Sequence, residues 1–169
     1  MHARLTLTIC LLLLLTVPAL AQLKGDYVGS YDGDQVKATV GVKGKTVLRI
    51  YRLAAIDAPE VRGHQPGWQE SRDALRSGLT GKSVTITVRG RDTKWRRPLA
   101  VVTVDGEDVG LAQVLNGHAW FYRQYARSLT PEERTAYEAA ELEARQQHRG
   151  IWQQARPVPP WQWRKGKGR

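Results

Sequence analysis

The stretch Arg52-Leu53-Ala54-Ala55-Ile56-Asp57-Ala58-Pro59-Glu60 joins an apolar run to two carboxylates that flank a rigid proline. Residues 47–53 alternate apolar and polar side chains, which predicts a strand. The strand should end at Asp57-Ala58-Pro59, because proline lacks an N–H and restricts the residue before it. Arg52 is therefore expected on a strand, with Asp57 and Glu60 at or just past its end, where a rigid scaffold presents functional groups.

Length and charge limit the class of protein. The chain has 169 residues, which is typical of one domain. It carries 26 Lys and Arg against 16 Asp and Glu, a formal net charge of +10. A compact basic domain favours polyanionic partners, namely nucleic acid, anionic lipid or anionic glycan.

The first 21 residues are expected to be a cleaved signal peptide. Leu5 to Val17 is a nearly unbroken apolar run of 13 residues, too short to span a bilayer, and it precedes the small-residue site Ala19-Leu20-Ala21. Cleavage after Ala21 leaves 169 − 21 = 148 residues and a charge of +10 − 1 = +9, because Arg4 is lost. A lipoprotein site at Cys10 is a weaker alternative. The sequence predicts an exported protein, secreted or periplasmic, without cysteine.

Hydrophobic periodicity predicts an antiparallel α+β domain over residues 22–155. Helices are inserted after the third and fifth strands, with no βαβ alternation, and a closed five-stranded barrel is one natural solution that often binds oligonucleotides. The expected strands are two within 25–44, then 46–54, 84–88 and 99–104, and the expected helices are 67–80, 108–116 and 130–148.

Residues 156–169 form a basic tail that contains prolines and tryptophans. Pro157, Pro159 and Pro160 argue against regular structure there, so we expect either a tail packed through its tryptophans or a mobile basic arm. The cations of the tail are expected to be solvated and to add non-specific attraction to polyanions. They are Arg164, Lys165, Lys167 and Arg169.

Five charged residues are candidates for a single phosphodiester-cleaving site: Asp34, Arg52, Asp57, Glu60 and Arg97. Hard cations prefer oxygen ligands such as aspartates. Arginine offers a fork of donors for phosphate oxygens, and a free carboxylate can take a proton from water.

Three blocks of the chain resemble the signature of the staphylococcal nuclease (thermonuclease) family. They are Asp32-Gly33-Asp34, the segment 52–60, and Arg97-Pro98-Leu99-Ala100, in the family's order and with similar separations. The endings of bacterial members are similar to Trp161-Gln162-Trp163-Arg164. The resemblance extends from about Tyr27 to Lys165, and the block 52–60 is its most specific part.

The resemblance implies an OB-fold barrel with about three helices and a calcium-dependent endonuclease. It implies Ca²⁺ held by Asp34, Asp57 and the main-chain carbonyl of Ala58. It further implies Glu60 as the general base on water, with Arg52 and Arg97 binding the phosphate and stabilising its transition state. DNA and RNA would be the substrates, with little sequence specificity, and the products would carry 3′-phosphate or 5′-hydroxyl ends.

The chain departs from the family pattern at two places. Gln35 stands where threonine is usual, and the loop 93–98 gains Arg96 and Pro98 while it loses an acid and a glycine. An aromatic and basic set is expected to contact nucleic acid, since aromatic rings stack on bases and cations meet phosphates. Its members are Lys94, Trp95, Arg96, Tyr122 and Tyr125.

Two other classes of function compete with the nuclease. One is a catalytically impaired barrel that only binds nucleic acid or another polyanion, which the altered loop favours and the retained charged residues oppose. The other is a basic protein of the wall or membrane surface, which no amphipathic basic helix supports. We expect no stable membrane association after signal cleavage, and a monomer, because no coiled-coil seam is present.

Overall fold

The computed structural model describes residues 22–92 and 96–166. The predicted signal peptide, Lys94 and Trp95 lie outside these ranges. The strands are β1 (Gln22–Gly29), β2 (Gln35–Val42), β3 (Lys45–Leu53), β4 (Ile56–Asp57), β5 (Ser83–Arg91), β6 (Pro98–Val104), β7 (Glu107–Asp108) and β8 (Trp120–Phe121). The α-helices are α1 (Trp68–Leu79), α2 (Val109–Leu115), α3 (Pro131–Gln146) and α4 (Pro160–Gly166), and two 3₁₀ helices are η1 (Arg123–Ser128) and η2 (Gly150–Gln153).

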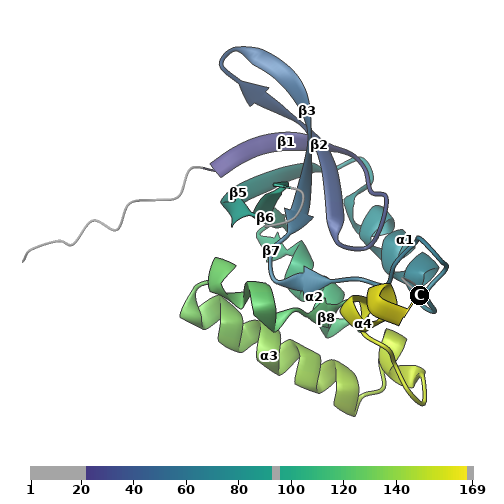
Figure 1. Cartoon of the computed structure of the whole chain (residues 1–169). Helices are drawn as coiled ribbons and strands as arrows, with labels where there is room; N and C mark the ends of the chain where they lie inside the picture. Colours follow the sequence, from purple (N-terminus) through teal and green to yellow (C-terminus); the bar gives the residue numbers. More distant parts are fainter. Residues whose placement is uncertain (1–21, 93–95, 167–169) are drawn as a thin grey trace, which may run out of the picture.

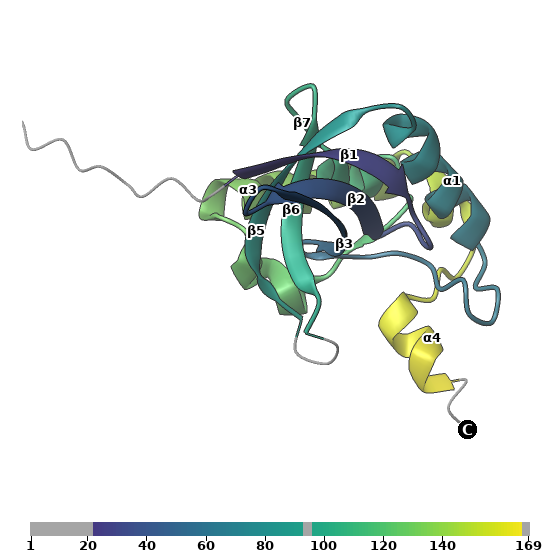
Figure 2. The ribbon, with the colours of Figure 1, turned by 90° about the horizontal axis from the view of Figure 1, so that it is seen from above.

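The main sheet closes into a five-stranded barrel, which confirms the predicted OB-fold of α+β class (Figure 2). Its order is β3-β2-β1-β5-β6, extended by the short β7, and β3 also pairs with β6. This last pairing is parallel, with Arg52 beside Leu99 and Leu53 beside Ala100. The predicted antiparallel barrel therefore closes through this one short parallel pair. An odd number of strands cannot alternate in direction all the way round, so one pair must be parallel.

Alternating side chains fill the inside of the barrel, as the sequence pattern predicts. Val36, Ala38 and Val40 of β2 are at most 1% exposed, and Ile86 and Val102 of the opposite wall have no exposed surface. The far ends of β2 and β3 leave the barrel as a projecting hairpin (Figure 1). Because the hairpin has no partner layer there, Leu48 and Ile50 are exposed.

Helices α2 and α3 pack against each other, with α2 next to β6 and α3 next to β8. Helix α3 begins at the predicted capping box, in which the Thr130 side chain accepts from the backbone N–H of Glu133 and the Glu133 carboxylate accepts from that of Thr130. Tyr137 of α3 is buried and donates to Asp108, the N-cap of α2, at 2.8 Å. Among the described residues no helix is long and apolar enough to cross a bilayer.

The C-terminal segment contains a helix, contrary to the expectation that its prolines forbid regular structure. Helix α4 starts at Pro160, a first position that proline suits because its missing N–H has no partner in a first turn. Pro160 is buried, and Trp161 stacks on Tyr122 with ring centroids 5.0 Å apart. Both views show α4 beside the segment that carries β4 (Figures 1 and 2).

Candidate active site

The turn before β2 brings Asp34 to the end of β3. The backbone N–H of Leu53 donates to the carbonyl of Asp34 at 2.8 Å. Only glycine fits at position 33, because a Cβ there would lie 1.8 Å from Oγ of Ser71 on α1. The buried amide of Gln113 donates to the carbonyls of Gly33 (2.9 Å) and Ser71 (3.0 Å). Helices α1 and α2 thus fix the turn that carries Asp34.

Arg52 joins two acids that are 23 residues apart in sequence. Its Nη2 atom lies 2.7 Å from Oδ2 of Asp34 and 2.6 Å from Oδ1 of Asp57. The side chain of Arg52 is 11% exposed, and those of Asp34 and Asp57 are 4% and 0% exposed. A guanidinium has five N–H donors, so these two ion pairs through one nitrogen leave others for an oxyanion.

Asp57 and Glu60 lie on either side of a rigid corner. Asp57 is paired with Trp120 in the small β4–β8 sheet, which buries it. The backbone N–H of Glu60 donates to the side-chain oxygen of Gln65 at 3.0 Å, and the carbonyl of Glu60 accepts from the N–H of Gln65 at 3.1 Å. Gln65 is 1% exposed. The backbone of Glu60 is therefore held while its side chain, 27% exposed, reaches solvent.

Burial sets the charge balance of this cluster. It raises the pKa of Asp57, an effect that Arg164 and Arg52 oppose. It also raises the pKa of Asp32 well above its ordinary value, with a further rise from the adjacent charge of Asp34. Gln35, one of the departures from the family pattern, donates to Asp32 at 2.6 Å. Burial and mutual repulsion therefore disfavour the ionised forms of these acids, and an added cation would favour them.

The predicted metal ligands lie together and have a free acceptor. Oδ1 of Asp34 is buried and has no hydrogen-bond partner within the described residues, and the same is true of Oδ1 of Asp32. The backbone N–H of Ala58 lies 3.4 Å from Oδ2 of Asp34, so the Ala58 peptide borders that carboxylate. No cluster of three His, Cys, Asp or Glu side chains with metal-binding geometry occurs in the described ranges. The predicted set needs only two carboxylates and a carbonyl, and these residues fit a hard cation.

Arg97 does not contact these acids in the described part of the chain. Its Nε atom donates to the buried carboxylate of Asp92 at 2.8 Å, and its carbonyl accepts from the N–H of Asp92 at 2.9 Å. Arg97 lies two residues before Leu99, and Leu99 pairs with Arg52. Arg96 has a positive φ of 57°, is exposed, and accepts through its carbonyl from Arg91.

Of the two tyrosines predicted to contact nucleic acid, Tyr122 lies beside the acids and Tyr125 packs against it. Tyr122 and Tyr125 are edge to face, with centroids 5.1 Å apart. The backbone N–H of Tyr122 donates to Ala55 at 2.7 Å, which places Tyr122 next to β4. Burial and the negative charge of Asp57 both raise the pKa of Tyr122. Tyr122 is thus close enough to the site to contact a bound chain.

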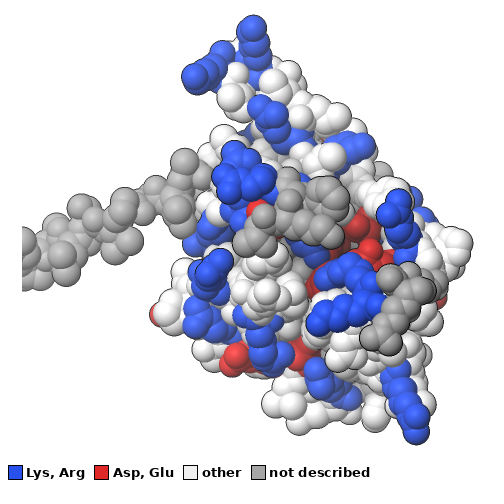
Figure 3. Space-filling model, in the orientation of Figure 1, with Lys and Arg blue, Asp and Glu red and all other residues white. Residues whose placement is uncertain are grey.

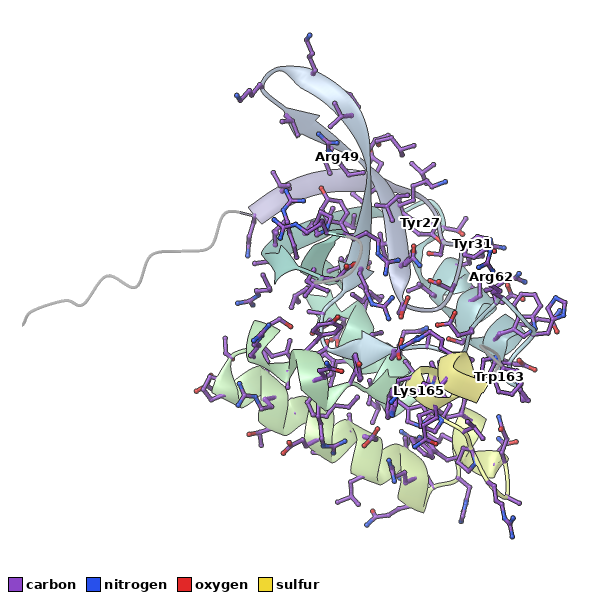
Figure 4. The ribbon with its side chains drawn as sticks, viewed as in Figure 1. Tyr27, Tyr31, Arg49, Arg62, Trp163 and Lys165 are labelled. Carbon is purple, nitrogen blue, oxygen red and sulfur yellow. The ribbon has the colours of Figure 1, made fainter. Side chains whose placement is uncertain are left out.

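Arg164 is a charged residue of this site that the sequence does not predict. Its Nη2 and Nη1 atoms lie 2.8 and 3.1 Å from the two carboxylate oxygens of Asp57, and Nη1 also pairs with Glu60. The expectation that Arg164 is a solvated tail residue is therefore wrong. Trp163 and Lys165 of α4 lie at the same side of the molecule as Arg62 and Tyr31 (Figure 4). Figure 3 shows acidic atoms gathered among cations on that side.

The contacts of Gln65 and Gln113 could not be predicted from the sequence either. Each binds two segments that are far apart in the chain: Gln113 contacts the turn at Gly33, 80 residues away, and Gln65 contacts Val158, 93 residues away. A glutamine carries no periodic or spacing signal for such contacts.

The acids and arginines at the rim of this barrel form a type of site that is suited to phosphodiester chemistry. The family model described as staphylococcal nuclease homologue matches residues 50–154. An uncharacterized endonuclease of Escherichia coli is 37% identical over 147 residues, which cover 87% of this chain and 88% of that protein. A micrococcal nuclease of Shigella flexneri is 32% identical over 162 residues, covering 90% of this chain and 87% of that protein. The chain belongs to the staphylococcal nuclease family, and its predicted class of enzyme, a nuclease, is confirmed.

Proposed function

We propose that this protein is a calcium-dependent endonuclease that hydrolyses phosphodiester bonds in DNA and RNA with little sequence specificity. The observation that carries the proposal is the meeting of Asp34 and Asp57 on one guanidinium, that of Arg52, next to a partly exposed Glu60. Burying charged groups costs desolvation energy, and such perturbed ionisable groups are concentrated at functional sites.

Glu60 is the group suited to activate water. Its carboxylate is at the rim, while Gln65 holds its backbone, so it can accept a proton from a water that attacks phosphorus. Asp34 and Asp57 are too buried for that task, and Arg52 already engages both. The roles of the three acids therefore differ because their exposure differs.

Arg52 is the donor best placed to bind the phosphate. Its side chain is fixed by two ion pairs, so its remaining N–H groups are oriented before substrate arrives and need no reorganisation as charge develops. Arg97, whose Nε atom donates to Asp92, would be the second phosphate donor. Asp34, Asp57 and the Ala58 carbonyl would hold the calcium ion, which supplies positive charge beside the phosphate oxygens.

DNA and RNA are the proposed substrates because the surface is basic and the arginines of the site are suited to phosphate, which both polymers share. We further propose an exported monomer that starts at Gln22. The mass of the intact mature protein tests this part, and a mature chain that retains Cys10 would contradict it.

The function is tested with plasmid DNA, a single-stranded DNA oligonucleotide and an RNA of equal length, each with calcium or with a chelator. We expect cleavage of all three with calcium, no cleavage with chelator, and 3′-phosphate or 5′-hydroxyl product ends. Binding of the oligonucleotides without cleavage, at any calcium concentration, would instead support the catalytically impaired alternative.

A further inference from the structure

The C-terminal helix α4 places a cation on the acids of the site. The fork of Arg164 meets both oxygens of Asp57 and also Glu60, three contacts that span more than 100 residues of sequence. Its neighbour Lys165 is exposed on the same helix. A bidentate arginine–carboxylate pair has a defined geometry, unlike the loose contacts of a solvated tail.

The same segment also covers the predicted base-stacking ring. Trp161 lies on Tyr122 with ring planes 22° apart, the arrangement that a nucleobase would adopt. The side-chain nitrogen of Gln65 donates to the carbonyl of Val158 at 2.7 Å, while its oxygen accepts from the N–H of Glu60. The segment 158–164 is therefore attached at three points, each next to a residue that the proposed reaction uses.

A divalent cation and the Arg164 guanidinium compete for the same oxygens. Oδ2 of Asp57 accepts from Arg164, and Oδ1 accepts from Arg52 and Arg164 together, so both oxygens of this fully buried carboxylate are already paired with positive charge. A cation placed on Asp57 would meet the guanidinium at close range, and the two like charges would repel each other because this carboxylate is shielded from solvent. Arg164 is 40% exposed, so it can leave without unfolding the barrel.

We propose that Arg164 is an internal counter-ion of the active site, and that α4 is a strap that calcium and a polynucleotide must displace. The inference rests on the proposed function, since it assigns calcium to Asp34 and Asp57. Arg164 takes the place of the cation at Asp57 and Glu60, and Trp161 takes the place of a base on Tyr122. The strap keeps the acids neutralised when calcium is scarce, and it raises the calcium concentration that the enzyme needs.

Calcium binding, measured by isothermal titration calorimetry without nucleic acid, tests the competition. Arg164→Gln should bind calcium at least about fivefold more tightly than the native protein, a coupling of ordinary size. Lys165→Gln is the matched control, because it removes one charge from the adjacent exposed position and should change the affinity by less than about twofold. Equal affinities for the two variants, or weaker binding by Arg164→Gln, would overturn the proposal.

Hydrogen exchange of residues 157–166 tests the displacement without any change of sequence. In the native protein, exchange of this segment should speed up when calcium and a phosphorothioate oligonucleotide are added, while α3 stays unchanged. Unchanged or slower exchange would show that α4 stays in place, and the strap would then be wrong. These readouts are separate from cleavage: a protein that never cuts nucleic acid refutes the proposed function, whereas an unaltered calcium affinity refutes only the strap.

Discussion

The guanidinium of Arg52 lies 2.6 Å from Asp57, whose side chain has no exposed surface. Removing one partner of a buried pair leaves an uncompensated charge and costs about 3–5 kcal/mol. Arg52→Met should therefore lower the free energy of unfolding, measured with urea and chelator at pH 7, by several kcal/mol. Arg49→Met, on an exposed position of the same strand, should have little effect. Equal stability of the two variants would mean that Arg164 alone balances Asp57.

Much of the barrel could be predicted because its information is local. Val36, Ala38 and Val40 alternate with polar residues, and that alternation alone marks the inner face of β2. The family blocks also located Asp34, Arg52, Asp57 and Glu60, which the structure brings to one rim.

The remainder depends on contacts between distant segments. Arg164 and Asp57 are 107 residues apart, and nothing in the spacing of cations in the tail distinguishes Arg164 from Lys165. The prediction that the prolines of the tail exclude regular structure was wrong for a related reason. A proline at a helix start favours the helix that a proline within it would break, so Pro160 is informative only when the start is known.

His118 makes the free energy of unfolding depend on pH, and it lies outside the acidic cluster of the candidate site. Burial lowers its pKa below the ordinary 6.5, and Glu70 offsets this only in part. The unfolded chain consequently binds more protons near pH 6, so this contribution to stability is complete above pH 6.5 and is lost as the pH falls below it. Urea unfolding between pH 7.5 and 5 should show a steeper loss for the native protein than for His118→Gln.

The control for His118 is His148→Asn, at an exposed position with a positive φ that asparagine tolerates. This variant removes an imidazole from an exposed position, so its pH slope is compared directly with that of His118→Gln. A His118→Gln variant with the native slope would show that the buried imidazole does not titrate differently in the folded state.

The loop arginines Arg96 and Arg97 form a matched pair of variants. Arg97→Ala should lower kcat by about 10²–10³, the effect of losing one donor to a transition-state oxyanion, even though Arg97 rests on Asp92 in this structure. Arg96→Ala should chiefly raise KM for oligonucleotides, because its side chain is exposed. A larger loss of kcat for Arg96→Ala would mean that the family block is aligned one residue too late, and that Arg96 has the role assigned to Arg97.

Glu60 gives the strictest test of the proposed chemistry. An amide cannot accept the proton of an attacking water, so Glu60→Gln should lower kcat by at least about 10². The side chain keeps its length, Gln65 still holds the backbone, and the buried Asp34 and Asp57 are unaltered. Folding and calcium binding should therefore persist, and oligonucleotide affinity with calcium should stay equal or rise slightly. The control is Glu107→Gln, an exposed acid on β7, which should cleave at the native rate. If Glu60→Gln folds, binds calcium and cleaves as fast as Glu107→Gln, Glu60 is not the base, and the water must be activated by another group.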